Sequence, residues 1–263
     1  MKFAFINNIK ATATKGAKGI CPNCGSQLIA KCGEIKVNHW AHKGIRNCDP
    51  WWENETEWHR LWKDNFPPDW QETILTDKIT NEKHIADIRT IHGLVVEFQH
   101  SHIDPQERSK RESFYKKMVW VIDGARLKRD FPRFLKGKEG FRLTKKKGFY
   151  LVNFPEECFP SAWIGSPVPV FFDFKSVEAN NDPEGWRNFL YCLLPKSNQR
   201  ESVVAIITRE QFVNGIIADT LFESKPVPQI QTAPSSINNN TRVSRRSSEY
   251  IYHRGRYIKR WRL

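Results

Sequence analysis

The stretch His84–Ser101, HIADIRTIHGLVVEFQHS, decides the fold because it predicts a β-hairpin. β-Branched and aromatic residues on both sides of Gly93 favour two strands, and the glycine favours the turn between them. A two-residue loop would place the carboxylates of Asp87 and Glu97 on opposite faces of the hairpin. A three-residue loop over residues 91–93, with Gly93 in the left-handed position of a bulged turn, places these carboxylates directly opposite each other. We therefore expect the loop length to decide whether the two carboxylates lie close enough to act together.

In the bulged register, Asp87, Glu97 and Gln99 share one face of the hairpin. The other face is expected to be the core face, and it carries Ala86, Ile88, Leu94, Val96 and Phe98. Two carboxylates directly opposite each other repel, and a divalent cation between them would remove the repulsion. Hard oxygen ligands suit Mg²⁺ or Mn²⁺, here with the Phe98 carbonyl as a further ligand. The alternative is a pair of solvated acids on an exposed face.

The sequence before the hairpin, ENETEWHRLWK, predicts an amphipathic helix. Glu55, His59 and Lys63 recur at i, i+4 and i+8 and form one polar stripe. The apolar stripe is formed by Trp58, Leu61 and Trp62. Beside the hairpin, this helix would add a third carboxylate and a base, whereas the alternative is an ordinary helix with a solvated side.

Four of the six cysteines lie within residues 21–48, with histidines among them. Such spacing is typical of tetrahedral Zn²⁺ and of a reducing compartment. Five residues compete for the four positions of a structural zinc site: Cys21, Cys24, His39, His42 and Cys48. Cys32 ranks last, because it lies in a strand-like stretch without a paired ligand. The alternatives are a redox CxxC motif and free buried cysteines.

Taken together, these motifs resemble the CoiA-like competence protein family. They occur in the family's order, as CPNCG, HWAH, ENETEWHRLWK, HIADI and VVEFQHS, over about residues 20–123. The resemblance implies a PD-(D/E)xK nuclease-like fold of the D…ExQ variant, linked to DNA recombination. It implies that Asp87 and Glu97 are metal ligands and that Gln99 stands where most such nucleases carry lysine. The residues that match the family's helices are Glu55, His59 and Lys63, which would complete the catalytic site, and Arg111 and Tyr115, which would contact DNA.

The order of predicted elements agrees with this resemblance. A helix from about Trp52 to Asn65, a strand in 70–79, the hairpin, a helix in 101–117 and a strand in 118–124 give αβββαβ, an α/β core. We expect four parts: a zinc domain at 1–50, the nuclease-like core at 51–123, a basic region with an α+β extension at 124–222, and a flexible linker with a basic aromatic tail at 223–263.

The charge balance predicts an acidic partner. Lys and Arg number 42 against 29 Asp and Glu, a net charge of +13, which favours nucleic acid first. No apolar run approaches the length of a membrane span, so no membrane partner and a cytoplasmic location are expected. Basic residues interleaved with aromatics suit contact with DNA, single- or double-stranded, and the candidates are Lys145, Lys146, Lys147, Arg254, Arg256 and Arg260. The alternatives are a solvated surface and a mobile tail.

Three functions are consistent with these features. The first is a metal-dependent DNA nuclease, in which Lys63 supplies the cation that Gln99 lacks and His59 acts as a base or acid. The second is a DNA-binding recombination accessory that keeps the fold, acts with recombination proteins and cleaves nothing. The third, a zinc-held interaction module without DNA contact, is disfavoured by the positive charge.

Overall fold

The computed structural model describes residues 1–44, 48–51, 55–195, 201–222, 250–253 and 256–259. The chain forms two compact units, Met1–Lys225 and Pro226–Leu263. The expected boundaries after residues 50 and 123 fall inside the first unit and stay predictions. In the described part of the chain, no helix is long and apolar enough to cross a membrane.

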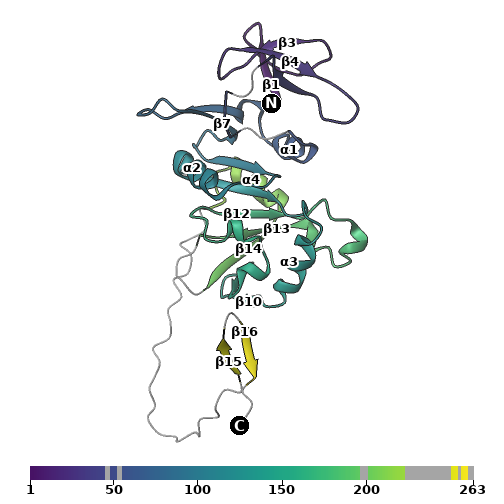
Figure 1. Ribbon diagram of the computed structural model, residues 1–263, viewed down its shortest axis with the longest axis vertical. Coiled ribbons are helices and arrows are strands. Elements are labelled where there is room, and N and C mark those ends of the chain that lie inside the picture. The colour runs from purple at the N-terminus through teal and green to yellow at the C-terminus, as the bar shows by residue number, and fades with distance from the viewer. Residues whose placement is uncertain (45–47, 52–54, 196–200, 223–249, 254–255, 260–263) are drawn as a thin grey trace, which may run out of the picture. The chain divides into compact units, whose positions relative to one another are not determined.

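The chain begins with a small antiparallel sheet of order β2-β1-β3-β4-β5. Its strands are β1 (Phe3–Ile6), β2 (Ile9–Thr12), β3 (Lys18–Ile20), β4 (Gln27–Lys31) and β5 (His39–His42). The core beneath them contains few large side chains, with Leu28 and Trp40 almost fully buried. Ile85 of β7 packs against this core, and Figure 1 shows the small sheet beside β7 and α1. A core of this size gives limited stability without a further constraint such as a metal.

A nine-stranded mixed sheet of order β10-β11-β14-β13-β12-β9-β8-β7-β6 follows. Its strands are β6 (Gln71–Thr76), β7 (Lys83–Arg89), β8 (Val95–Gln99), β9 (Met118–Asp123), β10 (Arg142–Leu143), β11 (Phe149–Val152), β12 (Val170–Asp173), β13 (Phe189–Leu193) and β14 (Ser202–Thr208). Strands β8, β9 and β12 run parallel, and the other neighbours are antiparallel. The helices are α1 (Glu57–Lys63), α2 (Pro105–Tyr115), α3 (Asp130–Lys138) and α4 (Arg209–Ile217).

Helices cover both faces of this sheet. One core holds Trp120 of β9 with Tyr115 of α2 and Phe134 of α3. The opposite core holds Val121 of β9 with side chains of the other two helices, Trp62 of α1 and Phe212 of α4. Neighbouring residues of one strand therefore point into different cores, as the alternation of side chains along a strand requires.

The segment from α1 to β9 has the expected order αβββαβ, as α1, β6, β7, β8, α2 and β9. Helix α1 starts after Thr56, whose side chain accepts a hydrogen bond from the His59 backbone N–H and caps the helix. Part of the expected helix start, residues 52–54, lies outside the described residues. Helix α2 starts at Pro105 with Asp104 as its N-cap, inside the stretch 101–117 where the sequence predicts a helix.

The hairpin has the three-residue loop. Gly93 has a φ of +79°, and its N–H donates to the Thr90 carbonyl at 3.0 Å. Ile88 pairs with Val96, which sets the register that places Asp87 opposite Glu97. The expectation of a single core face was incomplete, because every residue of β8 is buried between the helix layers.

The ladder of backbone hydrogen bonds between β7 and β8 ends at Ile88. Beyond it, side-chain carboxylates accept hydrogen bonds from the backbone N–H groups in place of backbone carbonyls. The Asp87 backbone N–H donates to a Glu97 carboxylate oxygen at 3.1 Å, and the Phe98 N–H donates to the Asp87 carboxylate at 3.0 Å. Strand β7 continues from there in pairing with β6 alone. We call this divergence, with Asp87, Glu97 and Phe98, the hairpin fork.

The second unit contains a two-stranded antiparallel hairpin, β15 (Tyr250–His253) and β16 (Arg256–Lys259). Arg256 pairs with His253 at its end. Arg254 and Arg260, two candidates for DNA contact, lie outside the described residues.

Replacing Gly93 by alanine should lower the free energy of unfolding by about 1 kcal/mol, because a side chain disfavours positive φ. No atom lies within 4 Å of the added Cβ, so the cost is conformational rather than steric. Denaturant unfolding measures it. Gly33→Ala, at an exposed glycine with equal space and no positive φ, is the matched control, and equal effects at both positions would contradict this account of the register.

Candidate functional site

Three cysteines and one histidine converge in the N-terminal domain. The ligand atoms of Cys21, Cys24, His42 and Cys48 lie within 4.8 Å of one another. The Cys21 and Cys48 sulfurs are 3.6 Å apart, and the Cys24 sulfur lies 3.3 Å from His42 Nε2. Three thiolates and one imidazole are the donor set of a structural tetrahedral zinc site.

The structure selects four ligands from the five candidates. His39 and His42 are both in β5, but three residues along a strand place their side chains on opposite faces. His39 Nδ1 instead interacts with the Val37 carbonyl at 2.9 Å. Cys32 lies outside the cluster. This agrees with the sequence analysis, which ranked it last among the candidate zinc ligands.

The thiols of the cluster have different proton affinities. Burial raises the pKa of Cys21, and it raises the pKa of Cys48 to about 12. Burial also acts on Cys24, but hydrogen bonds with Ser26 and His42 outweigh it and lower its pKa to about 6. A bound Zn²⁺ would stabilise all three as thiolates, because thiolates are the form that coordinates the metal.

We expect about one Zn²⁺ per chain on metal analysis of the purified protein. Cys21→Ser should lose the metal and loosen the first fifty residues, because it removes a ligand. Cys32→Ser is the matched control in the same domain and should keep the metal. A well-folded protein without metal would contradict the zinc site.

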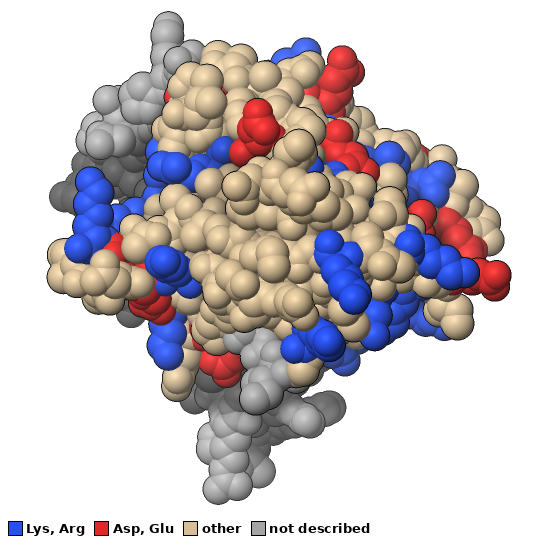
Figure 2. All heavy atoms as spheres, turned by 90° about the horizontal axis from the view of Figure 1, so that it is seen from above, with Lys and Arg blue, Asp and Glu red and all other residues tan. Residues whose placement is uncertain are grey.

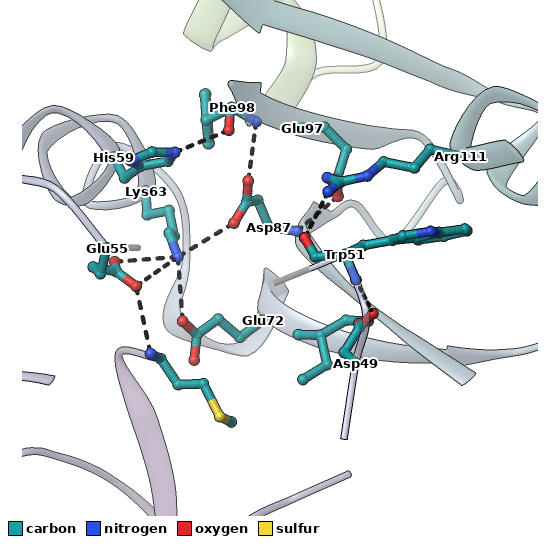
Figure 3. A pocket seen from close by; sticks show the side chains of 12 residues that line it. Asp49, Trp51, Glu55, His59, Lys63, Glu72, Asp87, Glu97, Phe98 and Arg111 are labelled. Atoms are coloured by element: carbon teal, nitrogen blue, oxygen red, sulfur yellow. Dashed lines mark hydrogen bonds and ion pairs between the residues drawn. The ribbon is translucent and has the colours of Figure 1, made fainter. Parts of the chain in front are cut away.

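The second candidate site is a small, largely enclosed cavity of about 60 Å³ at the hairpin fork. We call it the acidic cavity, and Figure 3 shows its side chains pointing toward one another from α1, β6, β7, β8 and α2. It is lined by Met1, Asp49, Trp51, Glu55, His59, Lys63, Glu72, Ile85, Asp87, Glu97, Phe98 and Arg111. Five carboxylates face Lys63, Arg111 and the Met1 amino group, and Arg60 pairs with Glu55 at 3.3 Å from outside the lining, so carboxylates outnumber the cations.

Lys63 is the counter-charge on the α1 side. Its side chain is 4 % exposed, and Nζ lies 3.2 Å from Glu55, 3.2 Å from Glu72 and 3.3 Å from Asp87. Burial alone would lower the pKa of Lys63, but the three carboxylates outweigh it and raise the pKa well above its ordinary value. Lys63 is therefore a permanent ammonium that joins α1 to β6 and β7.

Glu72 is a carboxylate that the sequence reasoning missed. Gln71 pairs with Ile88 and Thr73 with Ala86, so Glu72 lies opposite Asp87 on the edge strand. Burial would raise the pKa of Glu72, but the Lys63 charge and the N-terminal amino group outweigh it, with help from backbone N–H groups, and lower it to about 2. The position of Glu72 opposite Asp87 follows only from the pairing of β6 with β7.

Arg111 is the counter-charge on the α2 side. Its Nη1 lies 3.1 Å from Glu97, and it also contacts Glu107 and the Trp51 carbonyl. Burial and the nearby Asp87 charge raise the pKa of Glu97 to about 8, although the Arg111 guanidinium offsets part of the rise. Without a cation between them, the Asp87 and Glu97 carboxylates therefore repel each other, which costs free energy when both are ionised.

Asp49 and Trp51 form the wall that leads back to the zinc cluster. The Asp49 carboxylate accepts from the Ile85 N–H at 2.8 Å and the Trp51 N–H at 2.9 Å, and interacts with His84 Nδ1 at 2.9 Å. No role for Asp49 is expected from the sequence, because it lies beside the expected domain boundary after residue 50. Its position directly after Cys48 was the available signal.

Two predicted site residues have other partners. His59 Nε2 lies 3.0 Å from the Phe98 carbonyl, the oxygen expected to ligate Mg²⁺, and its Nδ1 lies 2.7 Å from Thr56 Oγ1. Gln99 is buried and directs its amide nitrogen to Ser101, and it is not among the residues that line the acidic cavity. His59 therefore joins α1 to β8, and Gln99 points away from the carboxylate pair.

The residues predicted to contact DNA are scattered. Arg111 and Tyr115 are buried, Arg111 in the acidic cavity and Tyr115 against Trp51 and Phe114. Lys145–Lys147 lie in the turn between β10 and β11, and Lys146 stacks over Phe149. Strand β11 lies five strands from β8, a lateral separation of about 24 Å across the sheet, so this turn is remote from the hairpin fork.

The comparison with protein families found a match in the first part of the chain. Residues 6–50 match the family described as Competence protein CoiA, N-terminal domain. The matched stretch includes all four residues of the zinc cluster. The match ends before α1, so it does not extend to the nuclease-like core that the sequence predicts. Neither a curated protein nor a solved structure matches the chain.

The acidic cavity makes stability depend on pH in a defined direction. The pKa of Glu97 is raised to about 8 in the folded protein. The folded state therefore holds a proton that the unfolded state has lost between about pH 4.5 and 8, and stability falls as pH rises through this window, by up to about 1.4 kcal/mol per unit. Without added Mg²⁺ or Mn²⁺, Glu97→Gln should flatten this slope between pH 5 and 8 in denaturant titrations. Equal slopes for both proteins would contradict the strained pair.

Proposed function

We propose that the protein is a metal-dependent DNA nuclease, acting in DNA processing or recombination. The observation that carries the proposal is the pair of carboxylates, Asp87 and Glu97, that face each other at the hairpin fork inside a cavity whose lining has more carboxylates than cations. Such a pair is suited to a hard divalent cation, and burial together with the nearby Asp87 charge raises the pKa of Glu97 to about 8. The similarity of residues 6–50 to the CoiA N-terminal domain supports a role in competence.

The chain's own residues would have separate roles in phosphodiester hydrolysis. Asp87 and Glu97 would hold Mg²⁺ or Mn²⁺, which supplies charge for the phosphate and a water of lowered pKa. Lys63, 3.3 Å from Asp87, would supply the cation that is usually on the neighbouring strand in such nucleases. Arg111 would keep Glu97 turned toward the cavity, and His59 would keep α1 against β8.

A DNA-binding accessory without cleavage is the second candidate. It is favoured by the charge balance of the fork, because Lys63 and Arg111 already partner Asp87 and Glu97 without a metal. It is also favoured by Gln99, which turns toward Ser101. Among the described residues, the zinc cluster is the only group of three or more potential ligands within 4.8 Å of one another.

Either function requires contact with DNA. The chain carries a net charge of +13. Figure 2 shows lysine and arginine side chains around the rim of one face, interspersed with aspartate and glutamate around a mostly uncharged centre. Scattered basic groups suit phosphate contacts without sequence preference. Lys145–Lys147 and the basic tail would extend these contacts beyond the fork.

Asp87→Ala and Glu97→Ala should each abolish cleavage of DNA while DNA binding is kept, because each removes a metal ligand and not a surface cation. The test incubates purified protein with single- and double-stranded DNA in Mg²⁺, Mn²⁺ or EDTA. Asp77→Ala, at a partly exposed aspartate in the turn between β6 and β7, is the matched control and should cut normally. If the wild type binds DNA and cuts none under any condition, the accessory function replaces the nuclease.

A further inference from the structure

One short segment belongs to both candidate sites. Cys48 is a member of the zinc cluster, and Asp49 and Trp51 line the acidic cavity. No other described ligand of the cluster is followed so closely in the sequence by residues of the cavity wall. The segment 48–51 therefore connects the two sites through the backbone as well as through contacts.

Asp49 holds the first half of β7. Its buried carboxylate accepts from the Ile85 N–H at 2.8 Å and interacts with the His84 ring at 2.9 Å. Ile85 precedes Asp87 by two residues, on the part of β7 that no longer pairs with β8. Along this part of the strand, Asp49 supplies the acceptor on the side where β8 has diverged.

Trp51 holds Arg111. Its carbonyl accepts from Arg111 Nη2 at 2.6 Å, and its ring lies 5.6 Å from the Arg111 guanidinium. The same ring stacks on His84, with centroids 3.2 Å apart. Arg111 in turn donates to Glu97 at 3.1 Å. Two chains of contacts thus leave the segment, one toward Asp87 through β7 and one toward Glu97 through Arg111.

We propose that the segment 48–51 couples the zinc cluster to the hairpin fork, with Asp49 and Trp51 as positioning residues for the Asp87–Glu97 pair. When Cys48 is held by zinc, the cavity wall is fixed, and β7 and Arg111 are held in place. When the metal is lost, Asp49 and Trp51 are released, and the fork opens. The functional role of this coupling rests on the proposed nuclease site. The coupling itself can be tested without DNA cleavage and without a divalent cation at the fork.

Hydrogen–deuterium exchange of the full chain tests the coupling. Removal of zinc by a chelator should speed exchange in residues 83–99 and 105–115 by about tenfold, along with the N-terminal domain, and leave β12–β14 unchanged. A rise confined to residues 1–44 would overturn the proposal. If removal of zinc unfolds the protein and exchange rises throughout the chain, the coupling is tested instead by exchange in the zinc-loaded variants Asp49→Ala and Asp49→Asn.

Asp49→Ala should keep one zinc per chain and still speed exchange in residues 83–99 and 105–115, because the metal remains while the link is cut. Asp49→Asn should restore most of the protection, since the amide oxygen still accepts from the Ile85 N–H. Asp77→Ala, which removes a similar set of turn bonds to Ile79 and Thr80, is the matched control and should affect only its own turn. Unchanged exchange at the fork in Asp49→Ala would overturn the proposal, whether or not the protein cuts DNA.

Discussion

The structure around the hairpin fork depends on the neutralisation of buried carboxylates on adjacent strands. The registers place Glu72 opposite Asp87 and Asp87 opposite Glu97, a row of like charges across β6, β7 and β8. Buried charges are costly unless they are paired. Lys63 from α1 and Arg111 from α2, on opposite faces of the sheet, provide the pairing. The positions of both helices are therefore tied to this row.

The same row explains why the sheet opens there. Backbone N–H groups inside a protein need acceptors, and at the fork the carboxylates of Asp87 and Glu97 accept from Phe98 and Asp87 in place of the ladder. The strands can then diverge without leaving these donors unsatisfied, and the small cavity lies in the divergence. Lys63 and Arg111 make the cavity stable without a metal, whereas the raised pKa of Glu97 shows that the compensation is incomplete. A nuclease requires a divalent cation to bind between Asp87 and Glu97 despite Lys63 and Arg111. An accessory protein requires Lys63 and Arg111 to remain the only partners of the two carboxylates when divalent cations are present.

The N-terminal domain contributes to this region as more than an appended module. The Glu72 carboxylate accepts from the backbone N–H groups of Lys2 and Phe3 at 2.6 and 3.0 Å, so β1 is joined to the edge strand of the large sheet. Cys48 and Asp49 form a second link on the other side of the cavity. A core this small gives limited stability by itself, so a Zn²⁺ bound by the cluster would stabilise the region from which both links extend.

The sequence by itself determined the features that depend on short separations. The position of the hairpin, the order of the elements around it and the cysteine-rich zinc cluster follow from local patterns, because turn geometry and side-chain alternation act over a few residues. The sequence left two loop lengths open, and the structure has the three-residue loop that places Asp87 opposite Glu97. Tertiary structure alone placed Glu72 and Asp49 in the acidic cavity and turned Arg111 inward, while Gln99 was turned away. These outcomes depend on the pairing of β6 with β7 and on the packing of α2 and the segment 48–51. Such contacts join residues far apart in the chain, and no local pattern in the sequence encodes them.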